Sequence, residues 1–184
     1  DPTESRGLGD VYKRQASNYS EDLRIDHSIL EQHAEAYRKL RNTFRYLLGN
    51  LKDKVKLISF DEVQTKNFSE LEQLMLHKIF RLNNKFNKNF NEYNLHTLYK
   101  DLLNFCTIDL SSFYFDIRKD TLYCDPIESE KRKNCLTVLN IIINCLLKWF
   151  APILTFTTEE IYQIIKKERN SIHLESFPKI PQKW

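Results

Sequence analysis

The chain has 184 residues with a formal net charge of +3 at pH 7, and 41% of its residues are hydrophobic. This length suits one domain with a substantial core, and so mild a charge permits a nucleic-acid partner without indicating one. The four cysteines form no Cys-x-x-Cys pair and no histidine lies at finger-like spacing from them, so the sequence does not favour a metal site. No proline occurs between residues 16 and 125, and this scarcity of helix breakers favours long helices.

Residues 1–15 contain two of the three glycines and no apolar pattern. They read as the in-frame translation of a sequencing adapter, and we interpret them as a non-native scar outside the fold. A natural flexible tail is the alternative interpretation. The sequence that follows lacks the apolar stretch of a secretory signal, so we expect a cytoplasmic protein with reduced cysteines.

A first helix is predicted to begin near Asp26, a good N-cap residue, and to end with Gly49 at the C′ position. Residues three and four apart give it a continuous inward stripe: Leu30, His33, Tyr37, Leu40, Phe44, Leu47 and Leu51. Arg38, Arg41 and Arg45 have the same spacing on another side. A solvated basic face is ordinary in proteins, and contact with RNA phosphates is the functional alternative.

A second helix is predicted over about residues 67–92. Its expected core face consists of Leu71, Met75, Ile79, Leu82, Phe86 and Phe90. Lys78, Arg81, Lys85 and Lys88 follow one another at steps of three, four and three residues with no acidic residue between them. Such a dense stripe of one sign predicts a phosphate-binding surface, and a general lysine bias of the sequence is the rival explanation.

A third helix is predicted over about residues 95–117. Its expected inward residues are Leu98, Leu102, Phe105, Leu110, Phe113 and Ile117. Asp109 projects beside this apolar face and needs a partner if it is buried. Asp116 lies two turns away, too far for the two carboxylates to share a proton. We therefore expect these acids to form ion pairs with Arg118 or Lys119 rather than to act in catalysis.

A fourth helix, about residues 129–150, is apolar nearly all round, which is typical of the central helix of a soluble bundle. Polar residues recur at every turn, which argues against a membrane span. Thr157 and Glu160 form a predicted capping box at the start of a fifth helix, with Phe156 and Ile161 as its hydrophobic staple. Residues 172–177 are short and bounded by proline, and we expect an extended connector there.

Two blocks, YRKLRNTFRYLLGNL at 37–51 and NFCTIDLSSFYFDIRKDTLYCD at 104–125, resemble the helical anticodon-binding domain of isoleucyl-tRNA synthetases. Further blocks follow the order of that family: residues 19–25, 151–154 with 157–161, and 171–178. The resemblance implies an all-α fold, an antiparallel bundle of about five helices. It also implies a division of the chain into 16–25 as the tail of a stem-contact linker, 26–170 as the anticodon-binding domain and 171–184 as an extended, truncated connector.

In the resembled family this domain holds the anticodon arm of the tRNA. A separate catalytic domain activates isoleucine with ATP and Mg²⁺ and esterifies the tRNA, so the full-length protein is expected to be an isoleucine–tRNA ligase. The resemblance implies no catalytic residue, metal or cofactor in this stretch, because the catalytic domain and the family's C-terminal zinc-binding segment lie outside it. The implied partner is isoleucine tRNA, with no DNA or membrane partner, and a monomer is expected.

Binding a single-stranded loop requires a positive surface and planar groups on which bases stack. Our candidates for the positive surface are Arg38, Arg41, Arg45, Lys78, Arg81 and Lys85. Trp149 and Tyr162 are weaker candidates for stacking, and core packing is the expected role of Trp149. Two alternatives stay open: the same domain of a valyl- or leucyl-tRNA synthetase, and a non-enzymatic helical protein-interaction module.

Overall fold

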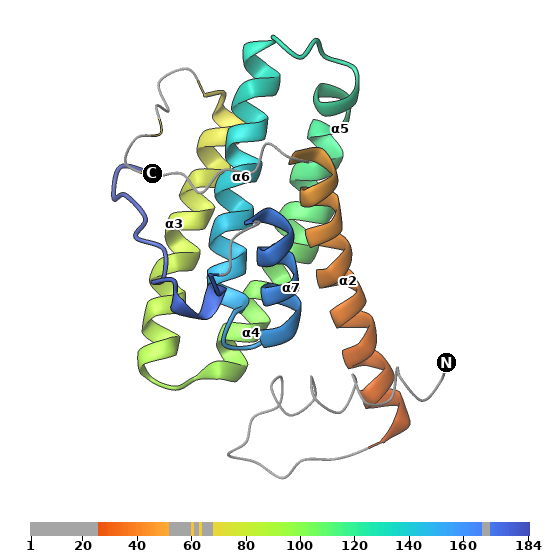
Figure 1. Ribbon diagram of the computed structural model, residues 1–184, viewed down its shortest axis with the longest axis vertical. Helices are drawn as coiled ribbons and strands as arrows, with labels where there is room; N and C mark the ends of the chain where they lie inside the picture. Colours follow the sequence, from red (N-terminus) through yellow and green to blue (C-terminus); the bar gives the residue numbers. More distant parts are fainter. Residues whose placement is uncertain (1–25, 52–59, 61–62, 64–67, 167–169) are drawn as a thin grey trace.

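The computed structural model describes residues 26–51, 60, 63, 68–166 and 170–184. The predicted scar at 1–15 and linker tail at 16–25 lie outside these ranges. The described part contains no strand, and its helices are α2 (His27–Leu51), α3 (Glu70–Asn91), α4 (Leu95–Asn104), the π-helix η3 (Phe105–Tyr114), α5 (Phe115–Tyr123), α6 (Glu130–Phe150), α7 (Thr155–Ile165) and the 3-10 helix η4 (Ile172–Leu174). Because α4, η3 and α5 form one continuous helix, the bundle has five main helices, and successive ones alternate in direction (Figure 1). The predicted all-α bundle is confirmed.

Helix α6 is the centre of the bundle, as its sequence predicts. It lies between α2 and α3 in Figure 1 and packs against both of them, and it also contacts α5 and α7. Every residue from 138 to 147 is buried. This includes two asparagines of its narrow polar stripe, and the Asn144 Nδ2 donates a hydrogen bond to the Asn140 carbonyl at 2.7 Å. The amide thereby satisfies a donor inside the core.

The first helix buries the predicted stripe from Tyr37 to Leu51, while Leu30 and His33 are only partly buried. The predicted C′ role of Gly49 is wrong, because α2 continues through it and no described glycine has a positive φ. Leu51, only 2% exposed, packs into the core beyond it. Burial of that side chain favours the extra helical residues over an end at the glycine.

The third predicted helix departs from the regular α pattern in its middle. In η3 the Ser111 and Ser112 hydroxyls donate to carbonyls five residues earlier, those of Cys106 and Thr107, both at 2.9 Å. A π-helix pairs residue i with i+5, so it changes the direction in which later side chains point. Ile117, predicted to face inward, is therefore 48% exposed, and Arg118 is buried one position later.

The predicted start of the fifth helix is wrong. Helix α7 begins at Thr155, so Thr157 lies inside its first turn and is not the N-cap. The Thr157 hydroxyl instead shares a hydrogen bond with the Tyr37 hydroxyl of α2 at 3.0 Å. Phe156 is 90% exposed and cannot act as a staple. A tertiary contact with α2 thus uses the threonine that the local pattern assigned to capping.

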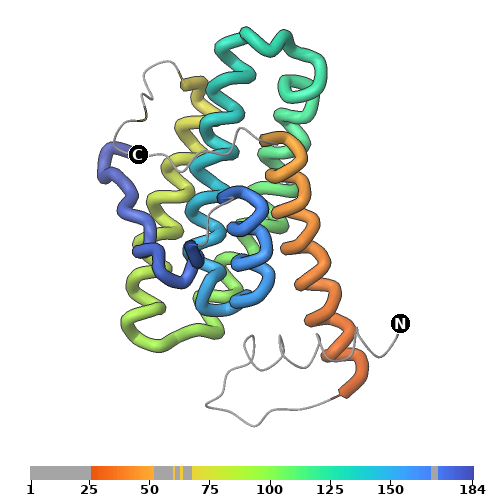
Figure 2. Tube along the Cα trace, in the orientation of Figure 1, coloured from red at the N-terminus to blue at the C-terminus, as the bar shows by residue number. Residues whose placement is uncertain are grey.

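The C-terminal stretch returns along α3 in the opposite direction (Figure 2). The Phe177 ring lies 5.0 Å from Phe86 and 4.8 Å from Phe90, near the end of α3. Trp184 borders a pocket beside Gln73, near the start of α3. This stretch, predicted as wholly extended, contains the η4 turn but no other helix. It covers α3 at Phe86 and Phe90, while Arg81 and Lys85 of the same helix stay exposed.

Candidate nucleic-acid interface

The α3 stripe lines a groove of about 320 Å³ against the α4–η3 helix. Lys78, Arg81 and Lys85 border one side of it, and Asp101 and Asp109 border the other. The Lys78 ammonium donates to Asp109, and the Lys85 Nζ lies 3.7 Å from the Asp101 Oδ1. Arg81 is exposed and has no ion-pair partner among the described residues. The groove therefore brings together three of the six candidate RNA contacts but neutralises two of them.

The partners of Asp109 and Arg118 differ from those expected. Asp109 is paired, as its position beside an apolar face predicted, but with Lys78 from another helix. The Lys78 ammonium also lies 5.6 Å from the centre of the Phe113 ring, a cation–π arrangement. Arg118 pairs with Glu72 and not with Asp109, while Lys119 pairs with Asp116 at 3.0 Å as expected.

Arg38, Arg41 and Arg45 form a second, separate basic surface on α2, and all three are exposed. Arg38 pairs with Glu35 one turn away, and both side chains remain more than half exposed. Helix α6 lies between α2 and α3 (Figure 1), so the two basic stripes do not share a groove. The structure thus divides the six candidates into an α2 set and an α3 set.

The aromatic candidates for base stacking are both in the core. Trp149 and Tyr162 are each 0% exposed. The Trp149 Nε1 donates to the Asn83 Oδ1 at 3.4 Å, and the Tyr162 hydroxyl donates to the Glu175 Oε1 at 2.7 Å. Core packing, the role expected of Trp149, is confirmed, and the suggestion that bases stack on Tyr162 is wrong.

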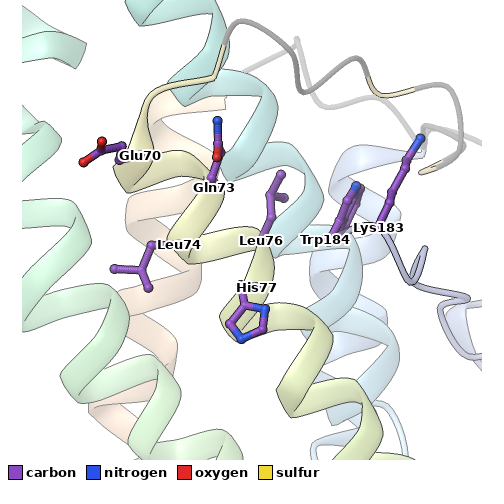
Figure 3. A pocket seen from close by; sticks show the side chains of 7 residues that line it. All are labelled: Glu70, Gln73, Leu74, Leu76, His77, Lys183 and Trp184. Carbon is purple, nitrogen blue, oxygen red and sulfur yellow. The ribbon is translucent and has the colours of Figure 1, made fainter.

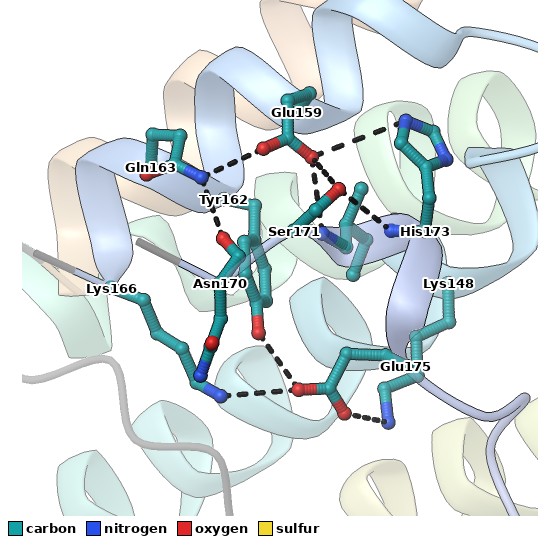
Figure 4. A network of polar contacts seen from close by, with 10 residues as sticks. Lys148, Glu159, Tyr162, Gln163, Lys166, Asn170, Ser171, His173 and Glu175 are labelled. Carbon is teal, nitrogen blue, oxygen red and sulfur yellow. Dashed lines mark hydrogen bonds and ion pairs between the residues drawn. The ribbon is translucent and has the colours of Figure 1, made fainter. Parts of the chain in front are cut away.

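Two glutamates fasten the C-terminal stretch to the bundle (Figure 4). Glu175 accepts hydrogen bonds from Tyr162, from Lys166 at 3.1 Å and from Lys148 at 3.3 Å. The Tyr162 hydroxyl first, and then the two ammonium groups, lower the pKa of the Glu175 carboxyl to about 2. Glu159 accepts from the Ser171 hydroxyl at 2.8 Å and from the Ile172 backbone N–H at 3.0 Å.

This network was missed by the sequence interpretation. Its members come from α6, α7 and the segment after α7, and no local spacing joins them. Glu159 is on α7, and hydrogen bonds from the Gln163 amide first and the Ser171 hydroxyl next lower its pKa. Both glutamates hold the chain in place, and neither faces the α3 groove residues. Their role in the site is to position the segment that lies along α3.

No group of three metal-ligating side chains occurs within the described ranges. Burial raises the pKa of the Cys106 and Cys145 thiols well above the ordinary value, so these cysteines behave as small apolar core residues. Among the helices that the structure describes, none combines the length and apolar character of a membrane span.

Comparison with known proteins bears directly on this bundle. The family described as "Anticodon-binding domain of tRNA ligase" matches residues 72–184, from the first turn of α3 to Trp184. The chain is 62% identical over 169 residues to an isoleucine–tRNA ligase of Pelagibacter ubique, with 92% of this chain and 19% of that protein covered. It is 39% identical over 168 residues to the isoleucine–tRNA ligase of Agrobacterium fabrum, covering 91% of this chain and 17% of that protein.

A third relative is the isoleucine–tRNA ligase of Syntrophomonas wolfei, 41% identical over 168 residues, with 89% of this chain and 18% of that protein covered. The chain thus spans about a fifth of the length of the curated relatives it matches. The resemblance drawn from the sequence blocks is confirmed. The family match includes the α3 basic stripe and leaves out the α2 arginines.

Proposed function

Because the chain belongs to the family of anticodon-binding domains of tRNA ligases, we propose that it binds the anticodon arm of isoleucine tRNA as one domain of an isoleucine–tRNA ligase. The family match over residues 72–184 carries this proposal. The names of the relatives supply the isoleucine specificity and favour it over the valine and leucine alternatives. In the full-length protein, ATP-dependent aminoacylation belongs to a separate catalytic domain, and we assign no catalytic residue to this chain. We further propose a cytoplasmic, monomeric enzyme.

The α3 groove supports the proposal because its three basic side chains differ in the free energy needed to break their existing ion pairs. Arg81 is exposed and unpaired within the described part of the chain, so it meets a phosphate without losing another partner. The Lys85 side chain is 58% exposed and its ion pair is long, and such surface pairs stabilise proteins by about 0–1 kcal/mol. Lys78 is 33% exposed and is held by both Asp109 and the Phe113 ring. We therefore expect phosphate contacts to weaken in the order Arg81, Lys85, Lys78.

The α2 arginines are a second proposed contact surface. Arg41 and Arg45 are exposed, and a guanidinium can hold a phosphate through two parallel hydrogen bonds. The residues that line the α3 groove include none from α2, so the two basic surfaces are distinct. The two sets therefore make separable contributions to affinity.

Fluorescence anisotropy with a labelled anticodon-arm hairpin of isoleucine tRNA, at several salt concentrations, tests the proposal. Neutralising phosphate contacts releases counterions, so affinity should fall as salt is added. Replacing Arg81 and Lys85 by Gln should weaken binding and reduce the salt slope by about one to two. Lys133→Gln is the matched control, because Lys133 is a 55% exposed, ion-paired cation elsewhere on the bundle.

An Arg41→Gln, Arg45→Gln variant tests the α2 surface in the same assay. Unchanged affinity and salt slope in both double variants would remove these stripes from the binding site. Equal affinity for isoleucine and valine tRNA hairpins would contradict the isoleucine assignment while leaving anticodon-arm binding in place.

A further inference from the structure

A pocket of about 570 Å³ lies between the N-terminal half of α3 and residues 183–184 (Figure 3). Gln73 and His77 border it on α3, and Lys183 and Trp184 border it from the C-terminal segment. Its volume falls within the range of about 300–1,000 Å³ that is usual for small-molecule sites. The pocket therefore has room for a group of the size of a nucleobase.

Trp184 is held in position by contacts within the described part of the chain. Its backbone N–H donates to the Pro181 carbonyl at 3.3 Å, and its ring centre lies 5.7 Å from that of Phe60. The indole Nε1 is buried and has no acceptor among the described residues. A tryptophan side chain offers this one donor, and leaving it unpaired costs free energy. The indole ring itself, which lines the pocket, offers an aromatic face on which a planar ligand can stack.

Three polar side chains of α3 line the pocket, namely Glu70, Gln73 and His77. The Gln73 Nε2 donates to the Phe68 carbonyl at 2.9 Å, which orients the amide and leaves its Oε1 as an acceptor. His77 is exposed on the next turn and can donate or accept at its ring nitrogens. Hydrogen-bonding groups of both kinds therefore line the same pocket as Trp184, as the recognition of a base edge requires.

The pocket continues into the exposed face of α3. Steps of four, four, three and four residues along that face give Gln73, His77, Arg81, Asn84 and Lys88, and all five are exposed. No acidic residue occurs from 73 to 91. Residues with this spacing lie on one side of a helix. A polynucleotide strand along α3 could therefore place a base in the pocket and a neighbouring phosphate on Arg81.

We propose that this pocket receives one unstacked base of a single-stranded RNA loop, stacked on Trp184, with its edge read by Gln73 and His77. The inference rests on the proposed anticodon-arm binding and names where one loop base is held. Sequence-specific recognition of RNA depends on unstacked loop bases that stack on aromatic side chains, and an indole is a suitable platform. The family match covers every residue lining the pocket except Glu70.

The test combines protein variants with hairpins that lack one loop base. The probe is the labelled anticodon-arm hairpin of isoleucine tRNA, alone and as a set in which each loop base is removed in turn. Trp184→Ala should weaken binding of the intact hairpin at least about fivefold, while Trp184→Phe keeps most of the affinity because a ring remains. Removing one particular base should weaken binding to the unaltered chain by a similar factor but should not affect binding to Trp184→Ala.

Phe156→Ala is the matched control, since Phe156 is a 90% exposed aromatic on α7 and its loss should leave affinity unchanged. Circular dichroism checks the helicity of each variant. If Trp184→Ala loses helicity, His77→Ala carries the test instead, because His77 is exposed. The expected result is then that removing the same loop base weakens binding to the unaltered chain but not to His77→Ala.

The possible failures can be told apart. If the unaltered chain binds no hairpin even at low salt, the proposed function itself is wrong. A second outcome is salt-dependent binding that Arg81→Gln weakens, in which removal of each loop base costs the Trp184→Ala variant as much affinity as it costs the unaltered chain. This outcome overturns only the base pocket. In a third outcome, Trp184→Ala is less stable, and removing any loop base weakens binding to His77→Ala as much as binding to the unaltered chain. Trp184 would then be a packing residue and not part of a base site.

Discussion

The two faces of α3 treat their charges in opposite ways. On the buried face the Glu72 carboxylate, in a side chain 1% exposed, accepts two hydrogen bonds of 2.7 Å from the Arg118 guanidinium. Ser69 and Tyr114 also contact this pair. On the exposed face Lys85 and Asp101 lie 3.7 Å apart at the edge of a groove. One pair is fixed in the core, and the other can exchange its partner for water or phosphate.

The difference shows why the basic residues of one helix have unequal functional value. A buried charge without a partner costs several kcal/mol, so Glu72 and Arg118 must remain together. The groove pair stabilises the fold by about 0–1 kcal/mol, so breaking it to bind RNA is inexpensive. Function is therefore expected on the face where the ion pairs are weak.

The largest expected effect comes from breaking the buried pair. Arg118→Met leaves the Glu72 carboxylate in the core without its cation, and the free energy of unfolding should fall by about 3–5 kcal/mol. Urea denaturation followed by circular dichroism measures this change. The double variant Arg118→Met, Glu72→Leu should recover most of the loss. Lys119→Met, which breaks an exposed pair one residue away, is the control and should cost less than about 1 kcal/mol.

A second prediction concerns two carboxylates that are similarly exposed but accept hydrogen bonds from different numbers of side chains. The Glu175 side chain is 28% exposed, close to the 26% of Asp101, but Glu175 accepts from three side chains. Its pKa is lowered from 4.5 to about 2, so the stabilisation that it gives is present above about pH 4.5 and is lost as the pH falls toward 2. Glu175→Gln should cost about 1–2 kcal/mol at pH 7, reduced by solvent screening.

Urea denaturation of both proteins between pH 7 and pH 2 tests this prediction. The difference in the free energy of unfolding should shrink below about pH 4.5, because the Glu175 carboxyl of the unfolded chain then takes up a proton, while that of the folded chain stays ionised until the pH approaches 2. A constant difference over the whole range would show that Glu175 acts through packing and not through its charge.

The sequence predicted those elements that depend on local pattern. The apolar run of α6 was placed within a residue of its observed bounds, and the α2 core stripe is buried from Tyr37 to Leu51, although its first two predicted positions, Leu30 and His33, are only partly buried. The departures arise where tertiary contacts override local preference. Thr157 looks like a capping residue but bonds to Tyr37, 120 positions earlier. The π-helix is invisible to a period of 3.6 residues and turned Ile117 outward.

The candidate site was predictable in composition but not in geometry. The spacing of Lys78, Arg81 and Lys85 placed them correctly on one side of α3. Their acidic partners, Asp101 and Asp109, come from the α4–η3 helix on the other side of the groove, and sequence spacing does not show such a neighbour. The pocket at Trp184 requires the C-terminal stretch to return along α3, which depends on aromatic and ionic contacts distant in sequence.

The smallest expected effect on stability belongs to the groove pair, and it comes with a gain in binding. Asp101→Asn removes the carboxylate that faces Lys85, and the free energy of unfolding should change by less than about 1 kcal/mol. The same change leaves the Lys85 ammonium without a competing partner and removes a negative charge that repels phosphate. Affinity for the anticodon-arm hairpin should therefore rise severalfold at low salt, and the rise should diminish at high salt because the interaction is screened.

Asp116→Asn is the matched control, since Asp116 is a 66% exposed acid paired with a lysine outside the groove. A gain in affinity equal to that of the control would mean that only net charge changed. The alternative result is a gain confined to Asp101→Asn and abolished when Lys85 is also replaced by Gln. It would show that the acidic side chains of the groove pair with the basic ones until RNA phosphates replace them.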